Sequence, residues 1–372
     1  MTASRPVSLN RAWLPGVDQL RALLALLVLF YHGYLLFSAR LIHHADFVFA
    51  DWPRTRNPVL AVLAEGHSAV AGFMVLSGFI FVQGTAGRGV RYGDFLRNRL
   101  LRIYPMYLIV VVFALSAGFG TFSLARLALL VLPLANYAIP VGPLAAMAWT
   151  VAVEFQFYLI FPLLLRLAET QGATWLVRAI LLALLLRLFA VLAGADAQWM
   201  SYWTIAGRID QFLLGMLIGL RFAGHGPERG GWPAVGIAGA GLWALLYGVH
   251  LAGGWPAHVW WKALWPDAEA LGWAGIILSW QGIADRLPAL LARGLEAIGR
   301  VSFSIYLLHF AVISVLAAHG WVLRPFASAT ADALLTTALL ALPLALALAA
   351  FTYATVERPF MALRRRYVAD AA

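Results

Sequence analysis

The sequence contains no cysteine and few charged residues. Only 12% of its 372 residues are charged, about half of the share in an average soluble domain. Without cysteine the chain has no disulfide, no thiolate metal ligand and no cysteine nucleophile. Acidic residues are scarcer than basic ones, 17 against 27, so the formal net charge is +10. Because 62% of the residues are hydrophobic, we interpret this charge as basic residues at the ends of membrane helices, and we expect no nucleic-acid partner.

Long apolar runs dominate what is present. About 20 apolar residues suffice for a helix to cross a bilayer, so the pattern predicts an all-α, polytopic membrane helical bundle. About ten transmembrane helices are expected, over residues 14–39, 60–83, 103–119, 143–167, 174–194, 203–222, 233–252, 269–283, 301–318 and 331–355. The segment 122–138 is short and contains Pro133, which predicts a re-entrant or interfacial helix there.

An even number of spans leaves both termini on one side of the membrane. Most of the basic residues fall on that side, so the positive-inside rule places both termini in the cytoplasm. The lipid bilayer is therefore the first expected partner. Composition does not change abruptly along the chain, which predicts a single transmembrane domain over 1–372, with its core at 14–360 and a cytoplasmic tail at 357–372.

The first span carries two ionisable side chains, Arg21 and His32. Eleven positions make about three helical turns, so both side chains lie on one face, roughly 16 Å apart along the axis. Ionisable groups inside a membrane usually face a polar interior. A neutral imidazole there suits a general base. The alternative is an arginine that reaches the interface and a histidine that bonds a neighbouring helix.

Glu154 lies among aromatic residues at a depth similar to that of His32 and His309. A buried carboxylate requires a partner. Glu154 could hold His32 in one tautomer and stabilise its imidazolium. The alternative is a structural ion pair with Arg208 or Arg187.

Three further segments carry polar groups that chemistry could use. Arginines at 97, 99 and 102 could bind phosphates bidentately, or could simply anchor the topology. The small residues of 72–79 favour close helix packing. In the segment 302–309, Tyr306 and His309 share a helix face and could line the same cavity as His32, or could simply form hydrogen bonds with neighbouring residues.

The order of these motifs resembles acyltransferase family 3. The matching residues are Asp18-Gln19-Leu20-Arg21-Ala22 with His32, GFMVLSGF at 72–79, Arg99-Leu100-Leu101-Arg102-Ile103-Tyr104-Pro105, Trp149-Thr150 with Glu154 and Tyr158, Tyr306-Leu307-Leu308-His309, and Glu357-Arg358-Pro359. Six motifs in family order cover residues 16–360.

The resemblance implies a multi-pass O-acyltransferase of the bacterial inner membrane. Such an enzyme transfers an acyl group, usually acetyl, from cytoplasmic acyl-CoA to a hydroxyl of a carbohydrate or glycolipid. The implied co-substrate is acyl-CoA, and no metal is expected. The implied catalytic residues are His32, Arg21 and Glu154; the donor-binding residues are Arg97, Arg99, Arg102 and Tyr104; the substrate cavity includes Asp18, Ser77, Trp149, Tyr158, Tyr306 and His309.

Two other functions fit the residues without the resemblance. A proton-coupled transporter could use His32, Glu154 and His309 as a relay. A non-catalytic assembly partner would tolerate the loss of His32.

Overall fold

The computed structural model describes residues 13–117, 123–137, 143, 146–226 and 230–368. These residues form helices joined by loops and contain no β-strand, and one isolated antiparallel bridge joins Val90 to Val368. The predicted all-α fold is confirmed. Parts of the expected spans 103–119 and 143–167, and both ends of the segment 122–138, lie outside the described residues.

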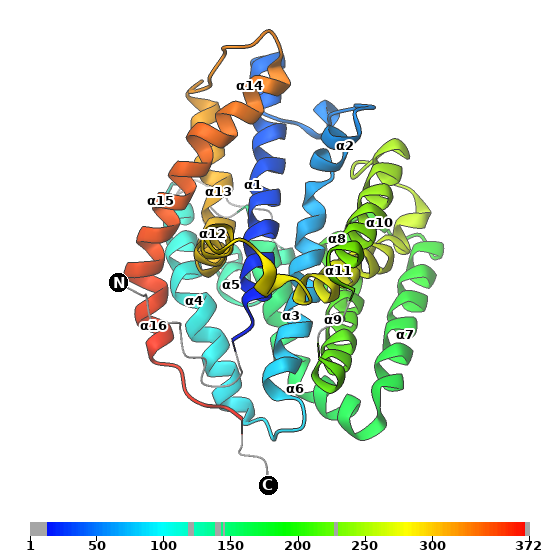
Figure 1. The fold of residues 1–372 in the computed structure, drawn as a ribbon. Helices are drawn as coiled ribbons and strands as arrows, with labels where there is room; N and C mark the ends of the chain where they lie inside the picture. Colours follow the sequence, from blue (N-terminus) through cyan, green and yellow to red (C-terminus); the bar gives the residue numbers. More distant parts are fainter. Residues whose placement is uncertain (1–12, 118–122, 138–142, 144–145, 227–229, 369–372) are drawn as a thin grey trace.

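The helices follow one another in this order (Figure 1): α1 (Pro15–His43), η1 (Phe49–Asp51), α2 (Pro58–Ala64), η2 (Gly66–Ser68), α3 (Ala69–Thr85), α4 (Tyr92–Ala117), α5 (Leu124–Val131), η4 (Ala135–Tyr137), α6 (Ala148–Gln171), α7 (Ala173–Leu192), α8 (Ala197–Trp203), α9 (Ile205–His225), α10 (Gly231–Leu251), η6 (Trp260–Ala263), α11 (Trp265–Gln281), η7 (Ala284–Arg286), α12 (Ala289–Arg300), α13 (Ser302–Ala318), α14 (Ala329–Thr336), η8 (Thr337–Ala341), α15 (Leu342–Thr352), η9 (Tyr353–Glu357) and α16 (Arg358–Ala362).

Seven helical segments of the described chain are long and apolar enough to cross a membrane. The number is eight if α12 and α13, bent by 73°, are one broken span. The expected count of ten is therefore not confirmed. Two of the expected spans are not among these segments. Helix α9 carries three charged side chains in 21 residues, and α11 has only 17 residues. Helix α5, with eight residues, is too short to cross, in line with the prediction for 122–138.

Helix α1 runs through the middle of the bundle, between α3, α12, α13 and α14 (Figure 1). Helices α3 and α9 pack against each other along much of their length. A Cβ atom on Gly78 would lie 2.1 Å from the carbonyl oxygen of Phe212, and one on Gly215 would lie 2.0 Å from that of Val75. The small residues of 72–79 thus serve helix packing.

The buried arginines of α7 and α9 pair with carboxylates. Arg187 lies 2.6 Å from Asp210 and also pairs with Asp267. Arg208 lies 3.3 Å from Glu269. Such pairing lets charged side chains stay inside a membrane bundle. Both arginines that could have paired with Glu154 therefore have other partners, and that alternative is wrong.

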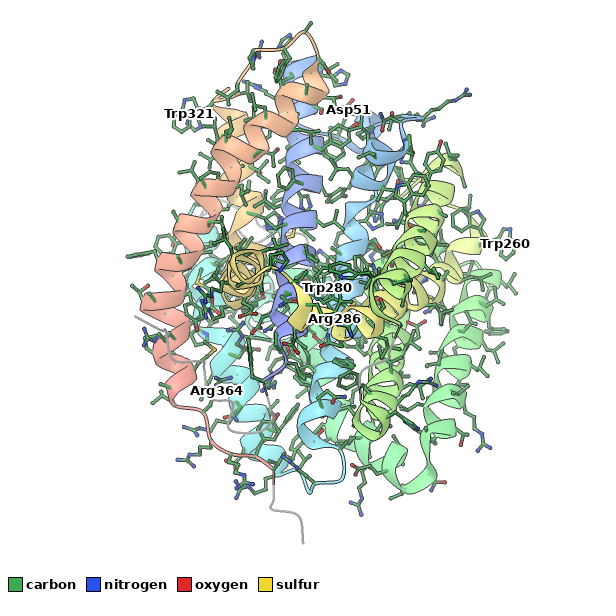
Figure 2. All side chains as sticks on the ribbon, in the orientation of Figure 1. Asp51, Trp260, Trp280, Arg286, Trp321 and Arg364 are labelled. Atoms are coloured by element: carbon green, nitrogen blue, oxygen red, sulfur yellow. The ribbon has the colours of Figure 1, made fainter. Side chains whose placement is uncertain are left out.

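The two ends of the bundle differ in what they carry. Figure 2 shows Asp51 and Trp321 at one end and Arg364 toward the other. At the second end, the segment 363–368 (hereafter the tail strap) lies against the start of α4. The Arg91 N–H donates to the Tyr367 carbonyl at 2.8 Å.

Candidate active site

His32 on α1 and His309 on α13 form a hydrogen-bonded pair. Their Nδ1 and Nε2 atoms, respectively, lie 2.9 Å apart, and their ring centroids are 5.0 Å apart. The sequence placed these residues at similar depth; the packing of α1 on α13 brings them into contact. His309 is fully buried, whereas His32 is partly exposed.

The hydrogen bonds assign a tautomer to each neutral ring. His309 Nδ1 lies 3.0 Å from the carbonyl of Ile305, which can only accept, so Nδ1 carries the hydrogen and Nε2 is an acceptor. His32 Nδ1 lies between this Nε2 and the carbonyl of Val28, at 3.1 Å, so His32 Nδ1 must donate. The unprotonated nitrogen of His32 is therefore Nε2.

His32 lines a cavity of about 370 Å³, hereafter the outer pocket. This volume is within the range of small-molecule sites. Its other walls are largely aromatic and come from segments spread along the sequence: Tyr31, Phe47, Phe49, His67, Trp149, Tyr202, Trp203, Trp255, Tyr306 and Phe310. Flat apolar rings with a few polar atoms suit a ligand that has both apolar and hydroxylated faces.

A second cavity of about 80 Å³, hereafter the inner pocket, lies near the start of α1. Arg21, Ser77 and Glu154 are among its lining residues. Val70 and Tyr306 line both pockets. The two pockets are therefore neighbours that meet at these two side chains.

Glu154 was expected to contact His32, but it bonds a different residue. Its carboxylate accepts a hydrogen bond from Ser77 Oγ at 3.0 Å and shares the inner pocket with Arg21. The partner that orients His32 is His309, an imidazole in place of a carboxylate. The expected pairing fails because residues at equal depth on two helices meet only if the helices are also rotated toward each other.

An arginine cluster lies at the cytoplasmic end proposed from the sequence. The guanidinium of Arg99 faces the rings of Phe81, Phe95, Tyr158 and Tyr367, with its Cζ atom 4.9, 5.5, 6.0 and 6.0 Å from the ring centroids. Arg97 Nη1 and Arg99 Nε are buried and make no hydrogen bond. Cation–π contacts hold a guanidinium in place without using its N–H donors.

The sequence profile of a family described as an acyltransferase domain matches residues 14–354. The chain belongs to acyltransferase family 3. It is 29% identical over 362 residues to the acyltransferase MdmB of Streptomyces mycarofaciens. The aligned region covers 87% of this chain and 88% of that relative. No solved structure matches the chain.

The protein is thus a multi-pass membrane acyltransferase. Family membership favours the transferase over the transporter. The structure agrees in one respect, because only two members of the expected proton relay, His32 and His309, are bonded to each other, whereas Glu154 is bonded to Ser77.

Arg102 of this acyltransferase is already engaged within the protein. It lies 2.9 Å from the carboxylate of Glu357, which also accepts a 2.5 Å hydrogen bond from Ser304. Glu357 is buried, so the pair ties α4 to η9 and α13. Tyr104 also joins two helices, because its hydroxyl donates to the carbonyl of Val131 at 3.0 Å and so holds α5 against α4.

Positive charge is concentrated where the tail strap meets α4. Burial, together with the nearby charges of Arg99 and Arg102, lowers the pKa of Arg364 to about 10. A pKa lowered by neighbouring cations indicates that a bound anion would be stabilised at this place.

The remaining predicted residues are split between these sites. Trp149 and Tyr306 line the outer pocket, whereas Asp18 and Tyr158 are among the lining residues of neither pocket. Asp18 lies 3.8 Å from Arg21. Tyr158 belongs to the ring cage of Arg99.

Sequence reasoning missed much of the outer pocket and the tail strap. Trp255 and His67, which line the outer pocket, are not among the residues predicted for the site. The available signal was the aromatic content of the loops 40–58 and 253–268. Tyr367, which completes the Arg99 cage, lies 268 positions from that arginine and carries no local signal.

Proposed function

We propose that the protein is an O-acyltransferase that moves an acyl group, most simply acetyl, from cytoplasmic acyl-CoA to a hydroxyl of a surface-destined carbohydrate or glycolipid. The whole chain forms one transmembrane domain in the inner membrane, with both termini in the cytoplasm. The observation that carries the proposal is the tautomer of His32, whose Nδ1–H is held by His309 and Val28 while Nε2 is left to take a proton.

The donor binds at the arginine cluster. A nucleotide carrying a pyrophosphate and a 3′-phosphate accepts hydrogen bonds from the unpartnered N–H groups of Arg97 and Arg99. Arg102, paired with Glu357, adds charge and holds the helices. The thin pantetheine arm then enters the inner pocket past Arg21 and Glu154. The charged headgroup never enters the lipid.

The acceptor binds in the outer pocket. Aromatic walls such as Trp149 and Trp255 offer flat faces for the C–H face of a sugar ring. A hydroxyl of the acceptor reaches His32 Nε2, which takes its proton as the oxygen attacks the thioester carbonyl. His309 accepts the Nδ1–H of His32 and so holds the ring. This hydrogen bond polarises as His32 takes the proton.

Coenzyme A release tests this proposal directly. Purified protein in lipid nanodiscs is given acetyl-CoA and octyl β-D-glucoside, and the free thiol is measured with a thiol reagent. Since the chain has no cysteine, the protein contributes no background. Acceptor-dependent release is expected; release no faster than in protein-free nanodiscs contradicts the proposal.

The His32→Asn variant tests the base. An asparagine amide reproduces the Nδ1–H donor to His309 but has no group at the position of Nε2. Loss of a positioned base typically costs 10²–10⁴-fold in rate, so about this loss is expected in a protein that still folds. A wild-type rate in this variant excludes His32 as the base.

The Arg99→Ala variant tests the donor site. We expect the KM for acetyl-CoA to rise while the KM for octyl β-D-glucoside stays unchanged. Arg166→Ala, which removes an exposed charge outside the cluster, is the matched control. A change confined to the glucoside KM contradicts the assignment.

A further inference from the structure

Tyr306 lies at the junction of the two pockets. Among the residues that the structure describes, it is one of two, with Val70, that line both the inner and the outer pocket. If the thioester arrives through one pocket and the hydroxyl through the other, their reacting atoms meet beside Tyr306. Val70 offers no polar atom there, whereas Tyr306 offers an O–H.

The Tyr306 hydroxyl is buried and makes no hydrogen bond. Thr150 is the polar neighbour of this hydroxyl. Its own hydrogen goes to the carbonyl of Met147 at 2.9 Å, and its oxygen is not placed to accept a hydrogen bond from Tyr306. The ring itself packs edge-on against Phe73, with centroids 5.9 Å apart. A phenylalanine would make the same ring contact.

An unsatisfied buried hydroxyl reduces stability, because the group loses its bonds to water and gains none in the protein. The Tyr306 O–H therefore does not contribute to folding in this state. A donor that is kept without a partner in a substrate pocket is free to bond a substrate atom.

Tyr306 also has a fixed position relative to the proposed base. It precedes His309 by three residues on α13, and their ring centroids are 5.9 Å apart. His309 in turn holds His32. The O–H donor and the base are therefore both neighbours of the same histidine.

We propose that the Tyr306 O–H donates the hydrogen bond that stabilises the oxyanion of the transfer reaction, an inference that rests on the proposed function. The acceptor oxygen forms a bond to the thioester carbonyl carbon, and its proton passes to His32 Nε2. The C=O π pair moves onto the carbonyl oxygen, which accepts the Tyr306 O–H. The oxyanion then re-forms C=O and the C–S bond breaks. The departing thiolate takes the proton from His32, which leaves an ester and free coenzyme A.

The Tyr306→Phe variant separates this role from a structural one. With acetyl-CoA and octyl β-D-glucoside, we expect kcat to fall by about 10²- to 10³-fold, as for other single oxyanion donors. Both KM values should stay unchanged. The melting temperature should equal or exceed that of the wild type, because the variant removes only an unpartnered hydroxyl.

Tyr107→Phe is the matched control. Tyr107 is also buried, but its hydroxyl donates to the carbonyl of Leu130 at 2.6 Å and lines neither pocket. This variant should lower the melting temperature and leave kcat within about twofold of the wild type, the reverse of Tyr306→Phe.

Three outcomes overturn the inference. They are an unchanged kcat in Tyr306→Phe, a rise in KM alone, or a melting temperature lowered as much as in Tyr107→Phe. Failure of the proposed function looks different, because then the wild type itself releases no coenzyme A. An active wild type together with a fully active Tyr306→Phe variant rejects the role of Tyr306 alone.

Discussion

The side chain of Asn98 exchanges two hydrogen bonds with the backbone of Arg365. Asn98 Nδ2 donates to the Arg365 carbonyl at 2.6 Å, and the Arg365 N–H donates to Asn98 Oδ1 at 2.9 Å. This double contact fastens the tail strap to α4, two residues before Tyr367 packs against Phe95, with centroids 5.3 Å apart. The tail strap is thereby a wall of the arginine cluster.

The first prediction follows from this contact. Asn98→Ala removes both hydrogen bonds, each worth about 1 kcal/mol net, and so loosens Tyr367 over Arg99. We expect the KM for acetyl-CoA to rise about five- to tenfold with little change in kcat. Initial rates of thiol release at varied acetyl-CoA measure this; an unchanged donor KM means that the strap does not form part of the site.

The second prediction concerns the partner of His32. In His309→Gln, the amide oxygen can stand near the former Nε2 and accept the Nδ1–H of His32. In His309→Ala nothing accepts it, and the tautomer is no longer fixed. The alanine variant should therefore lose about tenfold or more of kcat, and the glutamine variant should lose less. Equal activity of both variants would show that His309 does not orient the base.

The third prediction concerns the buried pair of Arg102 and Glu357. Breaking a buried pair by removing one partner typically costs about 3–5 kcal/mol. Arg102→Ala and Glu357→Gln should each lower the melting temperature clearly, while the double variant should lower it by much less than their sum. Additive losses in this double-mutant cycle would mean that the pair contributes no coupling energy.

The fourth prediction is a pH dependence of the stability, caused by Lys262 on η6. Burial lowers the pKa of Lys262 to about 8, below its usual 10.5. The unfolded chain therefore binds more protons than the folded one between pH 8 and 10.5, so this residue makes stability rise across that range. Below pH 8 the folded protein carries the cost of a buried charge.

Melting temperatures from pH 7 to 10.5 test this effect. The wild type and Lys262→Met should differ in slope, with the variant lacking the rise between pH 8 and 10.5. Lys262 donates to Gln198 at 2.7 Å and to the carbonyl of Trp255, so the variant is compared through its slope and not through its absolute stability. Parallel curves would contradict the assignment.

Local periodicity predicted what lies within one helix. The shared face of Arg21 and His32 follows from 3.6 residues per turn, and α1 does run without a break from Pro15 to His43. Apolar runs likewise predicted most helices. The expected count of ten spans is not confirmed, because an apolar run is also typical of a helix that is buried in the bundle, such as α11.

Contacts between distant helices could not be predicted in this way. His309 faces His32 across 277 positions, and Glu357 faces Arg102 across 255 positions. Each contact depends on the rotation and crossing of two helices, which a single sequence does not encode locally. Glu154 illustrates the failure, because its depth was inferred while its neighbour, Ser77, was not.

The distance in sequence between Arg99 and Tyr367 also orders the events of biosynthesis. Every helix from α4 to α16 must leave the ribosome before the last ring of the Arg99 cage can close. A nascent chain that has threaded most of its helices into the bilayer still lacks this wall. The proposed donor site is therefore completed only when the last helices of the chain have been made.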